Sequence, residues 1–325
     1  MKVIRKSINE ISELEKNQIN SFIEKNDGLI FHESNFNEIA SQAFKTEISY
    51  FLAFDNNKMV GICPIHSINT KLTKQSYSNP SQFEIPYGGW VFDKNKTSLR
   101  DLWRKMNISW NESLTYWSSF LTIDFPHIKG RREFHTGLVN LKMDLEDIWM
   151  KELTSTQRNK IRRAQKNGIE IIIEGIDSIN IFYKLLMEMN RKSEIHSKQI
   201  KYYKDIFQKY SFVNAAIFFA AKDKKIISCL FLVGNSNVIH YWQGATVFDV
   251  EKNLYQNELL HWEAIKWSQK RGSSYYDLCV IEPERLPSIA QFKMGFTKKL
   301  IPFYYISKKT FVFKVLNKIQ NVFTN

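Results

Sequence analysis

The chain has 325 residues, of which 43% are hydrophobic and 24% charged, and its net charge is +13. This length suffices for two domains with buried cores, and the composition is that of a globular protein. No apolar run reaches the roughly 18–20 residues of a membrane span, so the sequence predicts no integral membrane segment. The positive charge favours polyanionic partners such as nucleotide phosphates, coenzyme A, tRNA or an anionic membrane surface.

The cysteines disfavour a disulfide framework or a zinc site. Cys63, Cys229 and Cys279 are odd in number and widely spaced, and they form no CxxC pair. Proteins of a reducing compartment use cysteine in this way. We therefore expect a cytoplasmic protein without a metal.

Residue patterns in the first half of the chain predict an α/β lobe. Apolar residues at helical spacing indicate helices over residues 8–25 and 35–44. The turn signal at residues 55–57 separates two apolar runs and predicts a hairpin of residues 49–54 and 58–68. The other expected elements are an irregular strand at residues 85–90, a helix at 97–108, and strands at 116–123 and 138–143.

A second series of elements begins with a strongly basic helix over residues 155–166. Asn167 and Gly168 end this helix, because glycine suits the left-handed residue after a helix. A later helix ends at Gly272, and a strand ending in Asp277 follows it. The remaining elements are strands at residues 169–173, 215–221, 226–233 and 237–243, helices at 178–193 and 200–210, and a last strand after Phe296.

Both halves follow the order two helices, three strands, helix, strand, helix, strand. The repeat is one of architecture and not of residues. The sequence therefore predicts an α/β fold of two lobes, each a mixed, largely antiparallel sheet flanked by helices. We place the boundary near residue 145, with an N-terminal lobe of residues 1–145 and a C-terminal lobe of residues 146–325 that includes a terminal helix.

Two segments carry a resemblance to a known family. Residues 155–168 are similar to the pattern R-x-x-I-R-K-A-x-K-x-G, and residues 292–296 read F-K-M-G-F, which matches F-K-x-G-F. Together with the order of elements over residues 238–306, they resemble the second lobe of the Fem-like acyltransferases, which carry two tandem copies of the GNAT fold. The resemblance implies transfer of an acyl group to an amine.

The resemblance assigns Lys293 to stabilising charge at the reacting carbonyl. A fixed ammonium near a developing oxyanion lowers the barrier where water is excluded. Without the motif, a surface lysine between two core aromatics would be the better explanation of Lys293. Asp277, at a strand end beside the expected cleft, is our candidate catalytic carboxylate, although it alternatively holds a loop. Further candidates for the general base are His240, His261, Glu282 and Glu284.

The loop after Gln243 departs from the GNAT pattern for coenzyme A. GNAT enzymes bind the pyrophosphate with a Gln/Arg-x-x-Gly-x-Gly/Ala loop and the following helix N-terminus. Here the loop begins Gln243-Gly244-Ala245 and lacks this glycine spacing. The residues expected to bind coenzyme A are Lys252, Asn253, Asn257 and Phe292, with Asn253 alternatively a helix N-cap.

Several aromatic and basic residues lie where the family places acceptor-binding residues. Arginine grips phosphate with two parallel hydrogen bonds, and aromatic rings offer faces to a base or a sugar. The alternatives are core packing for the aromatic residues, and an ion pair or a bridge between lobes for the arginines. The expected substrate-binding residues are Tyr87, Trp90, Arg158, Arg162, Arg191, Tyr241 and Gln243.

Three functions are compatible with these features. We favour an N-acyltransferase that moves an acyl group from acyl-CoA to the amine of a dTDP- or UDP-linked amino sugar for surface polysaccharide, because no segment shows the sustained heptads of the helical arm of many Fem enzymes. The alternative is an aminoacyl-tRNA-dependent peptidyltransferase acting on a peptidoglycan precursor. The third is a binding module docked on a membrane by the amphipathic residues 310–323, which alternatively pack on the domain. None of them predicts DNA as a partner.

Overall fold

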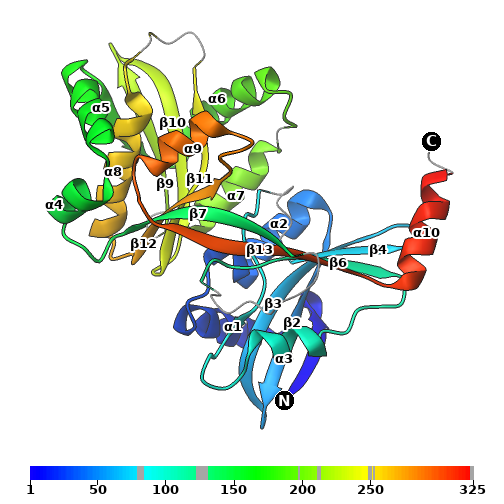
Figure 1. The fold of residues 1–325 in the computed structure, drawn as a ribbon. Coiled ribbons are helices and arrows are strands. Elements are labelled where there is room, and N and C mark those ends of the chain that lie inside the picture. Colours follow the sequence, from blue (N-terminus) through cyan, green and yellow to red (C-terminus); the bar gives the residue numbers. More distant parts are fainter. Residues whose placement is uncertain are drawn as a thin grey trace. The chain divides into compact units, whose positions relative to one another are not determined.

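The computed structural model describes residues 1–78, 84–121, 131–196, 198–210, 214–247, 251 and 253–322. Contacts divide the chain into two compact units (Figure 1). The first unit combines Met1–Phe134 with Pro302–Asn325, and the second is His135–Ile301. This division differs from the one predicted at residue 145, because the C-terminal residues contribute a strand and a helix to the first unit.

The first unit holds a mixed sheet in the order β1-β2-β3-β4-β6-β13, with β5 paired to β3. Its pairs are antiparallel except for the parallel pair β4 and β6. The strands are β1 (Lys2–Ser7), β2 (Glu47–Asp55), β3 (Lys58–Asn69), β4 (Lys74–Ser78), β5 (Val91–Phe92), β6 (Glu112–Trp117) and β13 (Leu300–Lys309). The helices are α1 (Glu13–Lys25), α2 (Ser34–Phe44), α3 (Leu99–Lys105) and α10 (Phe311–Val322).

The predicted hairpin is confirmed as β2 and β3, and Asn56 and Asn57 adopt the positive φ that its turn requires. The helix predicted at residues 8–25 is wrong at its start. Ser12 caps α1 by accepting the Glu15 N–H, so the regular helix begins only at Glu13.

Three further predictions for this unit are corrected. Residues 85–90 form no strand, and only β5 follows them. The strand predicted at 116–123 begins earlier, at Glu112, where its carboxylate is buried against Arg5 of β1. β1 itself was not predicted, since its short sequence lacks clear alternation.

The second unit holds a sheet in the order β7-β12-β11-β10-β9-β8. Its pairs are antiparallel except for the parallel pair β11 and β12. The strands are β7 (Arg132–Asn140), β8 (Glu170–Glu174), β9 (Ala215–Lys222), β10 (Lys225–Gly234), β11 (Val238–Thr246) and β12 (Tyr275–Ile281). The helices are α4 (Leu145–Asp147), a π-helical turn at Ile148–Glu152, α5 (Ser155–Lys166), α6 (Ile179–Lys192), α7 (Ile200–Tyr210), α8 (Gln256–Lys270) and α9 (Pro287–Met294).

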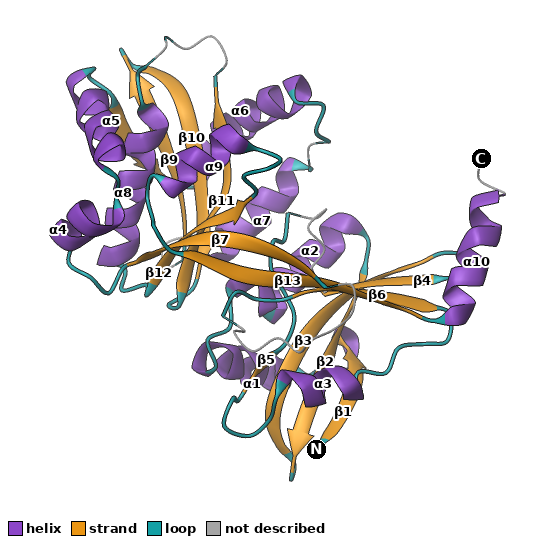
Figure 2. Ribbon diagram, viewed as in Figure 1, coloured by secondary structure: helices purple, strands orange, loops and turns teal. Residues whose placement is uncertain are grey.

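Helices cover both faces of this second sheet (Figure 2). Phe218 and Leu230 belong to the core that α5 and α8 complete, while Phe231 packs its ring edge-on against Phe182 of α6. Successive residues of a strand point to opposite faces, so a strand covered on both sides is apolar throughout. This explains the continuous apolar run of β9, whose residues from Ala215 to Ala221 are all buried. The expectation of mixed, largely antiparallel sheets is confirmed.

The two parallel strands of the second unit stay paired over only a short stretch. Their register runs Val238 with Tyr275, Ile239 with Tyr276 and His240 with Asp277. β11 continues to Thr246 and β12 to Ile281, so the described strands part after His240 and Asp277. The register of each strand with its other neighbour also shifts close to this point. β11 shifts against β10 at Trp242, and β12 shifts against β7 after Asp277. Such bulges bend a strand and re-aim its side chains.

No helix within the described part of the chain has the length and apolar character needed to cross a bilayer.

Candidate active site

A pocket of about 270 Å³ opens in the second unit beside the part of β11 that has left β12. Its wall combines the sheet with helices α6, α8 and α9. The residues that line it are Met189, Cys229, Leu230, Tyr241, Gly244, Ala245, Thr246, Asn257, Leu260, His261, Ser288, Ile289, Phe292 and Lys293.

Lys293 lies in this pocket and not on the protein surface, since it is only 8% exposed. Its Nζ donates a hydrogen bond of 2.8 Å to the backbone carbonyl of Val280 and lies 5.8 Å from the centre of the Tyr241 ring. Burial lowers the pKa of Lys293, although the nearby acidic groups of Cys279, Asp277 and Glu282 partly oppose this. Helix α9, which begins with Pro287, carries the lysine into position.

His261 lies beside Lys293 as a neutral ring. Its Nδ1 is 2.8 Å from the Tyr276 hydroxyl, and its ring meets the Tyr241 ring edge-on at 4.5 Å. Burial, together with the Lys293 ammonium, lowers the pKa of His261 to about 3. The imidazole therefore stays uncharged at neutral pH, where it can exchange hydrogen bonds but is a poor proton acceptor.

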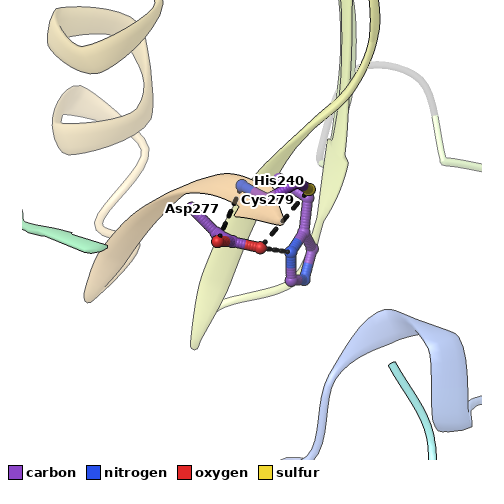
Figure 3. A group of neighbouring side chains, drawn as sticks. All are labelled: His240, Asp277 and Cys279. Carbon is purple, nitrogen blue, oxygen red and sulfur yellow. Dashed lines mark hydrogen bonds and ion pairs between the residues drawn. The ribbon is translucent and has the colours of Figure 1, made fainter. Parts of the chain in front are cut away.

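His240, Asp277 and Cys279 form a cluster where β11 and β12 part (Figure 3). His240 Nδ1 is 2.7 Å from Asp277 Oδ2, while Asp277 Oδ1 accepts from the Thr136 hydroxyl at 2.5 Å and from the Cys279 N–H at 2.9 Å. Burial acts to raise the pKa of Asp277, but the interactions with His240 and the other hydrogen bonds outweigh it and hold the pKa below its ordinary value. The carboxylate is therefore an ionised acceptor.

The cluster also fixes the backbone of β12. Cys279 has a φ of +57°, a left-handed conformation that is uncommon for residues other than glycine. The bond from its N–H to Asp277 holds this turn, and Val280 follows directly with the carbonyl that Lys293 binds. Imidazole, carboxylate and thiolate are zinc donors. Here the hydrogen bonds to Asp277 account for the arrangement, so we assign the cluster to bracing the bulge. Asp277 does not line the pocket.

The four residues expected to bind coenzyme A separate in the structure. Asn257 and Phe292 line the pocket, and the Asn257 side chain bonds Ser228 and Thr246, which ties α8 to the sheet. Asn253 is not the N-cap of α8, because the helix begins only after Tyr255 and Asn253 itself has a φ of +64°. Lys252 lies outside the described residues.

The first turn of α8 already contains a carboxylate. Glu258 is buried there, and its Oε1 lies 3.2 Å from the Lys160 ammonium of α5. Negative charge near a helix N-terminus interacts favourably with the helix dipole. Glu258 thus already takes the favourable position for a negative group at this helix end, and Lys160 offsets its charge.

Tyr87 and Trp90 are core residues of the first unit and do not line the pocket that holds Lys293. Both are fully buried. The Tyr87 ring packs edge-on against Phe120 at 4.8 Å and Phe303 at 5.1 Å. Trp90 donates its indole N–H to the sulfur of Met106 at 3.1 Å. These contacts agree with the packing alternative, and their expected role in substrate binding stays a prediction.

The arginines also lie apart from the pocket. Arg158 donates to the backbone carbonyls of Trp149, Met150 and Leu153, at 3.2, 3.3 and 2.6 Å. It thereby closes the carboxyl end of the π-helical turn, where carbonyls lack intrahelical partners. Arg162 is exposed and stacks over Trp149, with 5.4 Å from its Cζ to the ring centre.

Of the remaining acceptor candidates, only Tyr241 lines the pocket. Gln243 is half-buried on β11 outside it. Arg191, at the end of α6, lines a separate open hollow of about 420 Å³. No signal in the sequence marks Met189, Thr246 or Ser288 as pocket residues, because residues so far apart in the chain meet only in the folded protein.

Comparisons with known proteins point to one fold. The FemAB family model matches residues 111–225. FemX superimposes with a TM-score of 0.70 at 12% identity, covering 98% of this chain and 99% of that chain. L-PGS from Bacillus licheniformis matches at 0.51 and 12% identity, covering 91% and 92% of the two chains.

A tandem GNAT protein from the clavulanic acid biosynthesis pathway matches at a TM-score of 0.50 and 10% identity, covering 95% of this chain and 99% of that chain. A search of curated proteins by sequence finds no match. The predicted architecture of two tandem GNAT-like lobes is thereby confirmed. Residues 111–225 thus match the FemAB family, within a chain whose fold over nearly its whole length is that of FemX.

Proposed function

We propose that this protein is a Fem-type N-acyltransferase that moves an aminoacyl group from aminoacyl-tRNA to an amine of a peptidoglycan-precursor peptide. The observation that carries the proposal is the buried Lys293 ammonium, held by the Val280 carbonyl within a pocket. The amine attacks the ester carbonyl of the donor, a C–N bond forms, and the C–O bond to the ribose breaks. The amine proton ends on the ribose oxygen. Lys293 stabilises the negative charge that develops on the carbonyl oxygen.

The α8 terminus favours tRNA over coenzyme A as the donor carrier. The loop after Gln243 lacks the glycine spacing that cradles a pyrophosphate, and Glu258 supplies the first turn of α8 with its own negative charge. This reverses the order of preference that the sequence suggested. Transfer from acyl-CoA to a nucleotide-linked amino sugar is the competing hypothesis.

Helix α5 offers a surface for the tRNA backbone. Arg162, Arg163 and Lys166 are exposed on it, and the chain carries a net charge of +13. Lysine and arginine bind phosphates with little dependence on base sequence. We therefore assign α5 to holding the donor.

A donor assay tests the proposed reaction. The purified chain is incubated with tRNA charged with radiolabelled amino acids and a peptidoglycan-precursor peptide, and separately with acetyl-CoA and a dTDP-linked amino sugar. We expect labelled amino acid to become alkali-stable on the peptide, and no release of free thiol in the second reaction. Thiol release with acylation of the sugar, and no transfer from tRNA, would replace the proposal with the acyl-CoA hypothesis.

A charge-matched pair of variants tests the tRNA surface. Replacing Arg162, Arg163 and Lys166 by alanine is expected to weaken tRNA binding and to reduce the slope of log K against log salt by about two to three. The control replaces Lys184, Lys204 and Lys209, which are exposed on α6 and α7, and removes the same net charge. Equal weakening by both triple variants would assign the effect to net charge and not to α5.

A further inference from the structure

Helix α10 presents an apolar stripe to solvent on the first unit. Phe313 is buried against the unit, at 4% exposure. Phe311, Val312, Val315 and Ile319 are exposed by 79, 37, 42 and 42%. Residues at spacings of three and four lie on one side of a helix, so these four form a continuous stripe away from the buried Phe313. α10 is the red helix of Figure 1.

A second exposed aromatic lies at the start of this helix. Thr310, directly before α10, donates its hydroxyl to the backbone carbonyl of Trp110 at 2.5 Å. Trp110 is 66% exposed. Tryptophan combines a large apolar ring with an N–H donor, which suits a boundary between water and an apolar phase. Trp110 therefore adds an exposed aromatic residue whose backbone is bonded to the residue before α10.

Lysines border the stripe, and acidic residues are absent from the segment. Lys314 and Lys318 are exposed, and at about 100° per residue they lie beside Phe311 on the helix surface. Lys309 is exposed just before the helix. The sequence from residue 302 to 325 contains no aspartate or glutamate. The face is thus apolar along its centre and positive along its edge.

We infer that this face of the first unit binds the surface of an anionic phospholipid bilayer. Phe311, Val315 and Ile319 enter the boundary between headgroups and acyl chains, and Lys314 and Lys318 bind the acidic headgroups. An interfacial helix has this combination of an apolar face and flanking lysines. A second copy of the chain fits less well, because a two-fold contact through the same face would bring lysines against lysines.

Vesicle co-sedimentation of the full chain tests the inference. We expect binding to mixed phosphatidylglycerol–phosphatidylcholine vesicles, weakened by salt, and far less binding to phosphatidylcholine alone. The double variant Phe311→Ser, Ile319→Ser is expected to lower partition into the mixed vesicles at least about tenfold. Leu14→Ser is the control, because Leu14 is 69% exposed on α1 of the same unit and lies outside the stripe.

A charge variant separates the two contributions. Lys314→Ala with Lys318→Ala is expected to weaken binding to anionic vesicles by about fivefold for each lysine and to leave binding to neutral vesicles unchanged. The replaced side chains are exposed, so unaltered thermal unfolding of each variant verifies that it is folded. Equal partition of all variants would overturn the inference. A second result would also overturn it. If no chain bound vesicles, and sedimentation velocity showed concentration-dependent dimerisation that the Phe311→Ser, Ile319→Ser variant abolished, the face would pair two copies of the chain.

Discussion

The Lys293 ammonium is bound to the backbone carbonyl of Val280, 2.8 Å away, next to the bulge of β12. A buried ammonium loses its hydration and is stable only where other groups replace that water. Val280 supplies one such group, and its carbonyl is in place because Cys279 takes a left-handed conformation before it. The position of the amine nitrogen in the pocket therefore depends on the path of a neighbouring strand.

Replacing Lys293 by alanine is expected to reduce kcat by about 10²–10³, the loss typical of one donor to a developing oxyanion. Lys298→Ala is the control, since Lys298 is exposed a few residues away in the same segment. Single-turnover kinetics with the charged donor measure both variants. Unchanged turnover of Lys293→Ala would remove the lysine from the reaction.

Gly244 and Tyr241 are expected to be energetically coupled. A Cβ at position 244 would lie 2.5 Å from the Tyr241 hydroxyl, so Gly244→Ala forces that side chain to move within the pocket. We expect a loss of about 1–3 kcal/mol in the free energy of unfolding. Tyr241→Phe removes the nearer of the two clashing atoms, the hydroxyl oxygen, and leaves ring Cε2 at 2.8 Å, so the double variant should be more stable than the sum of the single effects. Urea unfolding of the full cycle measures this; additivity within about 0.5 kcal/mol would contradict the contact.

The variant Asp277→Asn distinguishes between two roles of this carboxylate, namely bracing the bulge of β12 and acting as the general base. If Asp277 holds the bulge, its loss is expected to lower the free energy of unfolding by about 1–3 kcal/mol, because the buried hydrogen bonds with Thr136, His240 and the Cys279 N–H lose their carboxylate acceptor. Glu282→Gln is the control, since it removes a partly exposed pair with Arg285 and only a weaker interaction with Lys293, and it should cost less than about 1 kcal/mol. A variant with wild-type stability and no turnover would instead return Asp277 to the role of base.

Stability is expected to fall as the pH drops below about 6.5. Burial lowers the pKa of His66 in the first unit and of His261 in the second to about 3. Between about pH 6.5 and 3 the unfolded chain therefore binds protons that the folded chain excludes. Between these two pH values, each histidine changes the free energy of unfolding by about 1.4 kcal/mol per pH unit. The stability that each contributes is fully present only above the pKa of the unfolded chain.

Urea unfolding of the His261→Gln variant at several pH values checks this. We expect the free energy of unfolding of the second unit to depend less on pH in this variant. The pH dependence that His66 gives to the first unit should remain. His196→Gln, a substitution at an exposed histidine of the second unit, is the matched control. A slope that is insensitive to His261→Gln would show that other groups govern acid unfolding.

Local signals in the sequence were sufficient for much of the secondary structure. Helix α5 runs from Ser155 to Lys166 as predicted, because Thr154 caps its start and Gly168 takes the left-handed conformation after its end. The β2–β3 hairpin follows from the two asparagines of its turn. Such features depend on residues only a few positions apart, so the sequence contains the information directly.

The same signals could not assign the candidate site. Tyr87 and Tyr241 were equivalent in sequence, yet one packs in a core and the other lines the pocket. Arg158 matched a family motif, and the structure uses it to close a helical turn. In each case the outcome depends on partners that are distant along the chain or on a backbone conformation that these partners impose.

The sequence by itself determined the α/β class, most helices and strands, and the motif that carries Lys293, because short-range periodicity and capping encode them. Only the tertiary structure decided that the C-terminal residues complete the first unit, that β11 and β12 part after His240 and Asp277, and that Lys293 is buried at Val280. Strand pairing and burial join residues far apart in the chain, and a bulge changes which face each side chain occupies. These long-range contacts therefore exist only once the chain is folded.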